Sequence, residues 1–271
     1  MRSAVRAITP KEFSLFQDLI KRKSGIFLPD HKISLLYNRL ERRVLVRGCK
    51  DFSAYYHLIT QRSETSELEA ALEHITTNET FFFRETQHFD FVRQWLANRA
   101  NEQGKLRVWS AAASSGEEAY SLAMTMDRYY QGPWEVFGSD INRQVIERAR
   151  EAIYPDVRTE GIDQHNRMTY CLKGTGEYQG YIRIAPELRR RVSFDCINLT
   201  EPINLNLGLY DLIFLRNVMI YFEKHTQQRV VSYLSRFLKK DGFFFVSHSE
   251  SLHSLNTGFE LVKPAIYRFK S

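Results

Sequence analysis

The chain of 271 residues contains only three cysteines, and they are scattered. Cys49, Cys171 and Cys196 form no C-x-x-C pair, which favours reduced thiols in a cytoplasmic protein. The eight histidines include His248 and His253, but no cluster with cysteine at ligand spacing, so we expect no metal site.

Long hydrophobic runs are also missing. No apolar run approaches the length that spans a bilayer, and the N-terminus lacks the apolar core of a secretory signal, so we expect no membrane insertion. A composition of 43% hydrophobic and 26% charged residues is typical of a soluble protein with one large domain or two smaller ones. The net charge of +6 leaves an acidic partner or a nucleic acid open.

The dinucleotide-binding fingerprint G-x-G-x-x-G is missing too, although the pattern of strands and helix in which it normally occurs is present. Residues 106–112 form a short apolar run typical of a buried strand, and small residues then lead to Gly116. Apolar spacing from Glu117 predicts a helix, and residues 134–138 predict a second strand. This order of strand, tight turn, helix and strand is the nucleoside-binding half of a doubly wound fold.

An acidic residue, Asp140, ends the second strand of this stretch. Acids at this position hydrogen-bond ribose hydroxyls. Because Glu117, Glu118 and Asp140 flank the turn, a positively charged adenosine such as S-adenosylmethionine suits it better than a pyrophosphate. A generic α/β turn is the alternative interpretation.

Residues 1–75 read as an all-helical region. Apolar spacing predicts helices over residues 10–23, from Asp30 (as the cap) through Val44, over 52–60 and over 66–75. In the second helix Arg39, Arg43 and Arg47 recur every four residues. Both a solvated face and a docking surface for an acidic helix fit this pattern.

Beyond residue 140, helical and strand patterns alternate, which predicts a mostly parallel sheet. The predicted helices cover residues 142–151 and 226–238; the strands cover 191–197, 210–215, 242–247 and 265–270. Two short alternating runs, 170–173 and 181–185, predict a hairpin. Ligands bind beyond the carboxyl ends of such strands, where polar residues occur at 116–118, Asp140, 198–199 and 216–217.

Five motifs resemble those of the chemotaxis receptor methyltransferases, the CheR family. They are T-T-N-E-T-F-F-F-R-E, W-S-A-A-A-S-S-G-E-E-A-Y-S, S-D-I-N, R-N-V-M-I-Y-F and G-F-F-F-V-S-H-S-E-S-L, in this order. The resemblance implies an α/β, Rossmann-like class I S-adenosylmethionine methyltransferase domain with an inserted small β-subdomain, preceded by an all-α domain. It implies methylation of glutamate side chains on chemoreceptor cytoplasmic helices.

The resemblance also gives boundaries and a cofactor site. We expect a receptor-docking helical domain over residues 1–75, a cleft-lining linker over 76–90, and the methyltransferase domain over 91–271, with the β-subdomain at about 168–194. The implied cofactor contacts are Asn78, Thr80, Arg84, Glu118, Asp140, Asn198, Leu199, Arg216 and Asn217. Arg84 and Tyr221 are the side chains expected beside the transferred methyl group, although a structural tyrosine packed on the sheet also fits Tyr221. His248 and Glu250 are expected to border the cleft or finish a strand.

Methyl transfer to a carboxylate needs no general base, because a glutamate of pKa about 4.3 is already ionised at neutral pH. We expect the products to be a glutamate methyl ester and S-adenosylhomocysteine, made by a cytoplasmic monomer. A non-catalytic cofactor-sensing or receptor-scaffolding module, or a nucleic-acid methyltransferase, is the alternative. Against the latter, R-N-V-M-I-Y-F follows the fourth strand, where amino-methylating DNA enzymes resemble D/N-P-P-Y/F.

Two surfaces are expected to meet the receptor. The first is the arginine stripe, at Arg39, Arg43 and Arg47, facing the methylation helices. The second is the β-subdomain, whose loop at Gly174, Thr175 and Gly176, with Arg183 nearby, is of the kind that captures a receptor C-terminal pentapeptide in the family. A hairpin that only covers the cleft is the alternative for this second surface.

Overall fold

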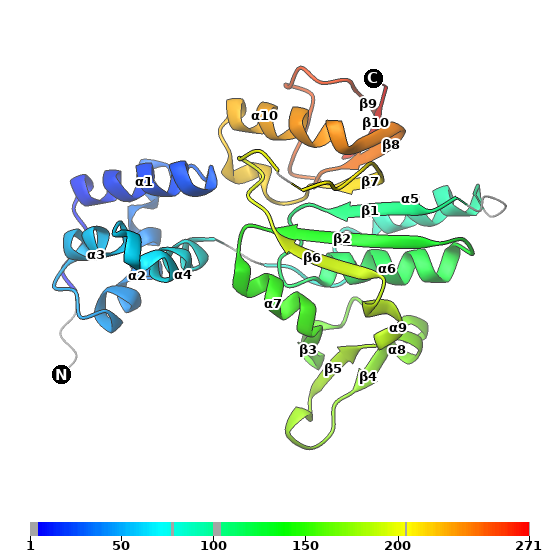
Figure 1. The fold of residues 1–271 in the computed structure, drawn as a ribbon, viewed down its shortest axis with the longest axis horizontal. Helices are drawn as coiled ribbons and strands as arrows, with labels where there is room; N and C mark the ends of the chain where they lie inside the picture. The colour runs from blue at the N-terminus through cyan, green and yellow to red at the C-terminus, as the bar shows by residue number, and fades with distance from the viewer. Residues whose placement is uncertain (1–4, 77–78, 100–103, 204, 271) are drawn as a thin grey trace. The chain divides into compact units, whose positions relative to one another are not determined.

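The computed structural model describes residues 5–76, 79–99, 104–203 and 205–270 (Figure 1). The chain divides into two compact units. The first comprises residues 1–77 together with 221–223, and the second comprises 78–220 and 224–271. The first unit is therefore discontinuous in sequence, which the sequence patterns did not predict.

The first unit is helical. Its elements are α1 (Pro10–Ser24), η1 (Asp30–Lys32), α2 (Ile33–Val46), α3 (Phe52–Ile59), η2 (Arg62–Glu64) and α4 (Thr65–Ile75). Helix α1 begins at a capping box, in which Thr9 Oγ1 accepts from the Glu12 N–H and the Glu12 carboxylate accepts from the Thr9 N–H. It ends at Gly25, whose φ of 74° lies in the left-handed region. The apolar stripes bury Phe16, Ile20, Leu36, Leu40, Val44, Phe52 and Tyr55.

One predicted cap in this unit is wrong. Asp30 does not cap α2, because the turn η1 comes between them and Asp30 is its first residue. The Asp30 carboxylate instead accepts a hydrogen bond from Gln17 Nε2 at 3.0 Å.

The second unit is built on a seven-stranded sheet of order β6-β2-β1-β7-β8-β10-β9. Its strands are β1 (Leu106–Ser110), β2 (Trp134–Asp140), β6 (Val192–Cys196), β7 (Tyr210–Phe214), β8 (Leu238–Phe245), β9 (Phe259–Lys263) and β10 (Ile266–Phe269). Strands β6, β2, β1, β7 and β8 run parallel, whereas β10 is antiparallel to β8 and to β9. The mostly parallel α/β sheet predicted from the sequence is confirmed.

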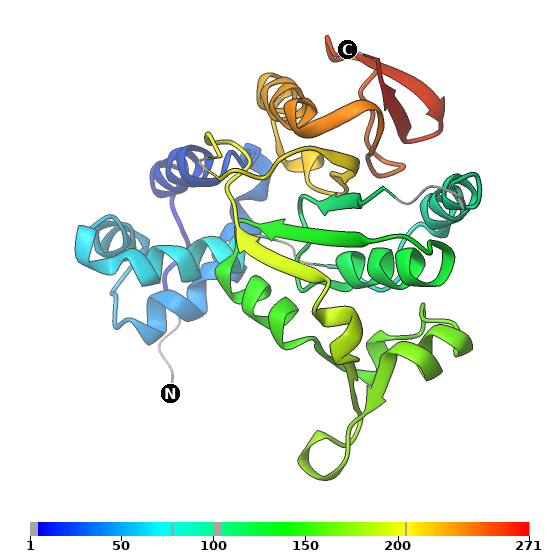
Figure 2. The ribbon, with the colours of Figure 1, turned by 45° about the vertical axis from the view of Figure 1, so that its right-hand side comes forward.

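Helices cover both faces of this sheet. On one side lie α5 (Thr86–Ala97), α6 (Glu117–Tyr129) and α7 (Arg143–Glu151), and on the other α10 (Lys224–Leu234), followed by η6 (Ser235–Phe237) (Figures 1 and 2). Helix α5 starts inside the segment expected to be a linker. It contributes Phe89, Val92 and Leu96 to the core beneath α6 and the central strands.

A second sheet has the order β3-β5-β4 and projects from the seven-stranded one (Figure 2). It contains β3 (Ile153–Pro155), β4 (Cys171–Lys173) and β5 (Tyr181–Ile184), with η3 (Asp156–Arg158), α8 (Gln164–Tyr170), η4 (Gly176–Tyr178) and α9 (Pro186–Arg189) around it. The predicted hairpin is present, but β5 also pairs with β3, which lies before the expected start at residue 168. A three-residue strand is too short to show alternation, so its sequence gave no signal.

In the part of the chain that the structure describes, no helix combines the length and the apolar character that crossing a membrane requires.

Candidate functional site

The carboxyl ends of the central strands meet at one edge of the sheet. Ser110 of β1 pairs with Gly138 of β2 and with Phe214 of β7, so the three strands are aligned there. Asp140 and Arg216 each follow their aligned residue by two positions. The predicted cofactor residues on different strands are therefore brought to the same edge by parallel pairing.

The backbone of the turn after β1 lies close to neighbouring residues of α7 and β3. Ser114 has a φ of 48° and Gly116 a φ of 95°. A Cβ on Gly116 would lie 2.9 Å from Ala149 Cβ and 3.1 Å from Tyr154 Oη, so the position requires glycine. The Tyr154 hydroxyl donates to the Ser115 carbonyl at 2.8 Å and fixes the turn.

Asp140 holds this turn in place. Its Oδ2 accepts from the Ser114 N–H at 2.9 Å, and its Oδ1 accepts from the Asn142 N–H at 3.0 Å. Burial raises the pKa of the Asp140 carboxyl, and these backbone donors oppose that shift. A carboxylate has about four lone-pair sites, so each oxygen can accept a further hydrogen bond from a ribose hydroxyl.

Arg216 is the centre of a polar network at the same edge. The residue is only 5% exposed. Its Nη1 donates to Glu118 Oε2 at 2.8 Å, and its Nη2 donates to the Arg84 carbonyl at 2.5 Å. Nη2 also lies 3.1 Å from Glu85 Oε2. The structure thus joins three predicted residues, Arg84, Glu118 and Arg216, and adds Glu85, which sequence reasoning did not select.

The predicted residues before α5 are placed differently. The Arg84 side chain donates to the Glu79 carbonyl at 2.8 Å and lies 5.5 Å from the Phe81 ring centroid. Only its backbone joins the Arg216 network. Thr80 is half-buried in the same segment, and Asn78 lies outside the described residues.

The segment after β6 lies beside Asp140, because the Ile197 N–H donates to the Asp140 carbonyl at 2.9 Å. The two predicted residues follow directly. Asn198 Oδ1 accepts from the N–H and the hydroxyl of Thr200, at 3.0 and 2.7 Å. Leu199 is buried, with 9% exposure. These contacts fix the segment as one wall of the site.

Glu250 clamps the loop after β7, a role that the sequence did not reveal. Its Oε2 accepts from the N–H of Asn217 at 3.0 Å and of Ser247 at 2.9 Å, and its Oε1 accepts from Ile220 at 3.3 Å. Asn217 has a φ of 57°, outside the usual range for a residue with a side chain. The carboxylate therefore fixes the loop that starts at Arg216.

We expect Glu250→Gln to weaken binding of S-adenosylhomocysteine, the demethylated product, about tenfold, because hydrogen bonds to a charged group contribute about 1.5–3 kcal/mol and one acceptor becomes an NH₂ donor. Calorimetric titration measures the affinity. Glu260→Gln is the control, since Glu260 is exposed on β9 and pairs with Lys270. Equal affinities of both variants would show that the clamp has no effect on the site.

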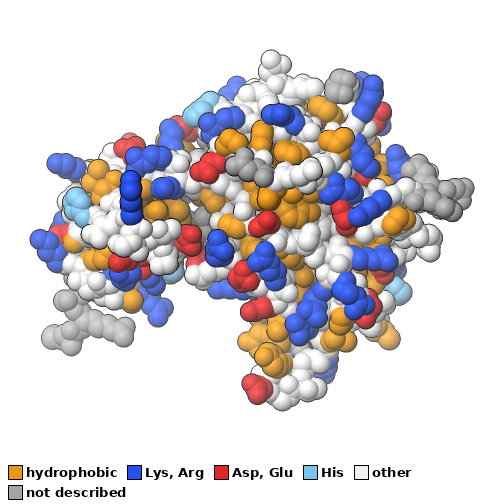
Figure 3. All heavy atoms as spheres, in the orientation of Figure 1, with side chains coloured by type: hydrophobic (Ala, Val, Ile, Leu, Met, Phe, Trp, Pro, Cys, Tyr) orange, Lys and Arg blue, Asp and Glu red, His pale blue; other side chains and the backbone are white. Residues whose placement is uncertain are grey.

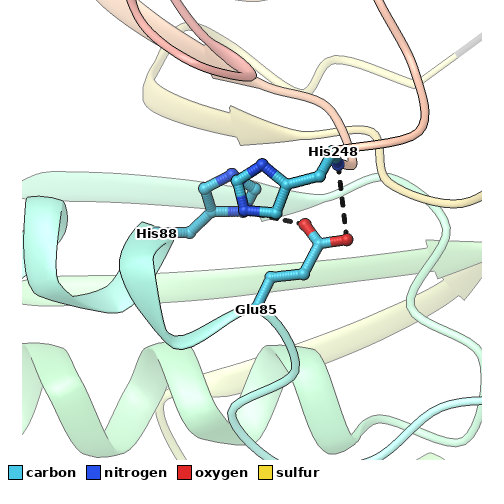
Figure 4. A group of neighbouring side chains, drawn as sticks. All are labelled: Glu85, His88 and His248. Atoms are coloured by element: carbon cyan, nitrogen blue, oxygen red, sulfur yellow. Dashed lines mark hydrogen bonds and ion pairs between the residues drawn. The ribbon is translucent and has the colours of Figure 1, made fainter.

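Three further side chains gather next to the Arg216 network: Glu85, His88 and His248 (Figure 4). His88 is fully buried. Burial, with the nearby Arg216 and His248, lowers the pKa of His88 to about 3, so its imidazole is neutral at pH 7. Sequence spacing puts Glu85 and His88 three positions apart, and His248 was expected only to border the cleft or finish a strand, so the grouping of the three was not predicted.

Tyr221, the second predicted catalytic residue, is half-buried at the end of η5 (Met219–Tyr221). The segment Tyr221–Glu223 belongs to the first unit. There the Tyr221 carbonyl accepts from the Phe27 N–H at 2.8 Å. Its role beside the transferred methyl group remains a prediction.

The arginine stripe makes contacts within its own unit. Arg39 donates to the carbonyls of His74 and Thr76, at 3.0 and 2.9 Å. Arg43 and Arg47 both bind the carboxylate of Glu67, which is only 3% exposed. The stripe therefore joins α2 to α4, whatever its part in docking.

The predicted peptide-binding loop has backbone positions that favour glycine. A Cβ on Gly174 would lie 2.0 Å from the Tyr178 carbonyl oxygen, and Gly176 has a φ of 59°. Thr175 precedes η4 in extended conformation. Arg183 is exposed and donates to the Glu151 carbonyl at 3.2 Å, but it lies on the central strand β5. The edges of this sheet are β3 and β4.

Comparison with known proteins covers nearly the whole chain. Residues 78–268 match the family model described as CheR methyltransferase, SAM binding domain, and residues 11–76 match CheR methyltransferase, all-alpha domain. The chain is 39% identical over 264 residues to the chemotaxis protein methyltransferase of Escherichia coli (strain K12), covering 96% of this chain and 91% of the relative. It is 30% identical over 272 residues to that of Borreliella burgdorferi, covering 96% and 95%.

Proposed function

The chain belongs to the CheR methyltransferase family, and from this we propose that it methylates glutamate side-chain carboxylates of chemoreceptors, as a cytoplasmic monomer. The supporting observation is the sheet edge at which Asp140 and the Arg216 network lie together. At this edge Asp140 can accept hydrogen bonds from ribose hydroxyls, and the Arg216 network supplies fixed polar groups. Open α/β sheets bind their ligands at this edge, outside the carboxyl ends of the strands.

The acidic residues at the edge fit a cationic ligand. Glu117 is fully buried at the start of α6, and its Oε1 has no hydrogen-bond partner among the described residues. Burial raises the pKa of Glu117. Glu118 follows Glu117 directly, and Asp140 ends the strand β2 that pairs with β1. Three acidic residues near the ends of two adjacent strands favour a ligand that carries positive charge.

The proposed reaction depends on how the two reactants are positioned, and it needs no general acid or general base. S-adenosylmethionine supplies a methyl group on a cationic sulfur. The receptor glutamate is ionised at neutral pH, so no residue of the chain has to remove a proton. Arg84 orients the glutamate carboxylate with directed hydrogen bonds, and Asp140 holds the ribose end. Orientation of the carboxylate toward the methyl group, together with exclusion of water, then accounts for the rate enhancement.

The test of the activity is incubation with labelled S-adenosylmethionine and receptor cytoplasmic fragments. Label on receptor that is released by alkali indicates a carboxyl methyl ester, the expected result. Alkali-stable label would indicate N-methylation, and no label on any fragment would favour a non-catalytic module. Sedimentation equilibrium of the purified protein tests the monomer.

Asp140→Ala should weaken binding of S-adenosylhomocysteine tenfold or more, because a buried charge-assisted hydrogen bond contributes about 1.5–3 kcal/mol. Asp140 also holds the Ser114 N–H, so thermal melting must be measured beside calorimetry. Asp195→Ala is a control from the neighbouring strand β6. Unchanged affinity in the Asp140 variant would remove this residue from the site.

We further propose that α2 meets acidic methylation helices of the receptor. Reversing Arg39 and Arg47 to glutamate should raise the Michaelis constant for receptor and leave cofactor affinity unchanged, since such charges steer association and are screened by salt. Arg43 is kept, because it makes two hydrogen bonds to buried Glu67. Arg47 makes one bond to Glu67, so thermal melting of the variant is measured beside its kinetics. Reversing the exposed Lys11 and Lys50 gives a control with the same net charge. If both pairs behave alike at low salt, only net charge matters.

The small sheet is proposed to capture a receptor C-terminal peptide by adding it as a strand. Edge strand β4 offers unpaired backbone groups. Exposed apolar side chains lie on β4 (Leu172), on β5 (Tyr181) and in η4 between them (Tyr178). Figure 3 shows apolar side chains on the projecting part of the second unit. Exposed Arg183 lies on the adjacent strand β5. Tethering would raise the effective receptor concentration to roughly millimolar. Pentapeptides with an aromatic residue should bind at micromolar concentrations, equally well after Arg84→Ala; absence of binding by all receptor peptides would exclude a tether.

A further inference from the structure

Glu85, His88 and His248 form a compact group of ligating side chains in the second unit. One ligand atom from each lies within 4.8 Å of the others. Figure 4 shows both imidazole rings and the carboxylate turned toward one another, with Glu85 and His88 at the start of α5 and His248 on the segment after β8. His88 Nδ1 is 3.5 Å from Glu85 Oε2, and the two imidazole centroids are 5.0 Å apart.

Buried atoms of this group have no hydrogen-bond partner. His88 has 0% exposure, yet neither its Nδ1 nor its Nε2 makes a hydrogen bond. Glu85 Oε2 makes no hydrogen bond either, and its one charged partner is Arg216 Nη2, at 3.1 Å among the described residues. Leaving a buried polar atom unsatisfied costs about 1–3 kcal/mol, so such atoms call for an explanation, and a bound ion is one that also fits the grouping of three ligating side chains. The contacts of the His88 ring are to the rings of Phe245 and His248.

We propose that Glu85, His88 and His248 bind a divalent transition-metal ion such as zinc. Two imidazoles and one carboxylate are an established zinc ligand set that leaves a fourth position open. Zinc bonds of about 2.0–2.1 Å place neighbouring ligand atoms about 3.3–3.5 Å apart in a tetrahedron. The group must therefore contract by about 1 Å or less per ligand atom, which exposed His248 can supply by rotating its side chain.

The positive charge of Arg216 links the proposed metal site to the sheet edge where the cofactor is proposed to bind. Arg216 lies 3.1 Å from Glu85 Oε2 and opposes a cation there, but it also pairs with Glu118 at 2.8 Å. A metal ion that draws Glu85 away leaves Arg216 with one carboxylate partner, Glu118, besides the Arg84 carbonyl. Because Arg216 also holds the Arg84 carbonyl, metal binding and cofactor binding should weaken one another. This coupling rests on the proposed function, whereas metal binding itself does not.

The test is calorimetric titration of zinc into chelator-treated protein without cofactor. We expect one site, weakened tenfold or more by His248→Ala and by Glu85→Gln. The control is His253→Ala, which removes a nearby exposed histidine outside the group. His248 is exposed, so its variant should fold normally, and circular dichroism checks this.

Cobalt(II) provides a second readout, because thiolate ligation gives strong near-ultraviolet absorption that imidazole and carboxylate ligands do not. Weak visible bands without that absorption, lost in His248→Ala, support the site. Zinc binding that both variants retain, or cobalt bands from thiolate, would overturn it as adventitious binding by cysteine. If zinc binds as expected but leaves the affinity for S-adenosylhomocysteine unchanged, the coupling is wrong and the metal site stands.

Discussion

Replacing Arg216 by leucine is expected to lower the free energy of unfolding of the second unit by about 3–5 kcal/mol, the usual cost of removing one partner from a buried ionic network. Its 5% exposed side chain serves Glu118, Glu85 and the Arg84 carbonyl together. Leucine would leave two carboxylates beside each other without a cation. Arg216→Lys should recover only part of the loss, because one ammonium cannot span the three partners.

Urea unfolding followed by tryptophan fluorescence measures this effect, since Trp95, Trp109 and Trp134 all belong to the second unit. Arg229→Leu is the matched control: Arg229 is exposed on α10, and a change within about 0.5 kcal/mol is expected. An Arg216 variant as stable as the control would mean that water screens the network and that its geometry contributes little.

Arg84→Ala is expected to lower turnover on receptor about 100-fold, because loss of the group that orients the reacting carboxylate forfeits the near-attack geometry. In the structure the side chain donates to the Glu79 carbonyl and lies beside the Phe81 ring, so its contact with the receptor carboxylate stays a prediction. Arg84→Lys should also be poor, since an ammonium cannot reproduce the planar fork. Tyr221→Phe should lose less turnover, with cofactor affinity little altered.

Turnover is measured at saturating receptor fragment and cofactor, and affinity for S-adenosylhomocysteine is measured separately. Arg93→Ala, on exposed Arg93 of α5, controls for loss of a positive charge nearby. A lysine variant with near-normal turnover would show that Arg84 supplies charge and not direction.

Much of the fold could be predicted because its signals are local. The apolar run of β1, the small residues before Gly116 and the helical spacing of α6 lie within one continuous stretch. Elements with weak local signals were missed: β3 has three residues, and α5 begins at Thr86 after Glu85, which is in left-handed conformation and provides no side-chain cap. The expected linker over residues 76–90 therefore contains the first turn of a helix.

The candidate site, like the fold, has residues that local signals predicted and residues that they did not. Asp140 and Arg216 could be placed because Asp140 ends an apolar strand and Arg216 follows another. Their partners could not, since Arg84 and Arg216 are 132 residues apart and Glu250 reaches back to Asn217. Likewise, a basic stripe looks the same in sequence whether it faces a receptor or, as for Arg43, binds Glu67 of a neighbouring helix. Long-range pairing leaves no trace in a single sequence.

The discontinuity of the first unit has a consequence for synthesis on the ribosome. Its helices are translated first, but Ile26 forms an antiparallel bridge with Phe222, and Lys21 pairs with Glu223 at 2.7 Å. At 5–20 residues per second, roughly 10–40 s pass between translation of Ile26 and of Phe222. During that interval the N-terminal helices must persist with this edge open. A chaperone that recognises nascent apolar segments should therefore bind stalled chains ending before residue 221 and release longer ones.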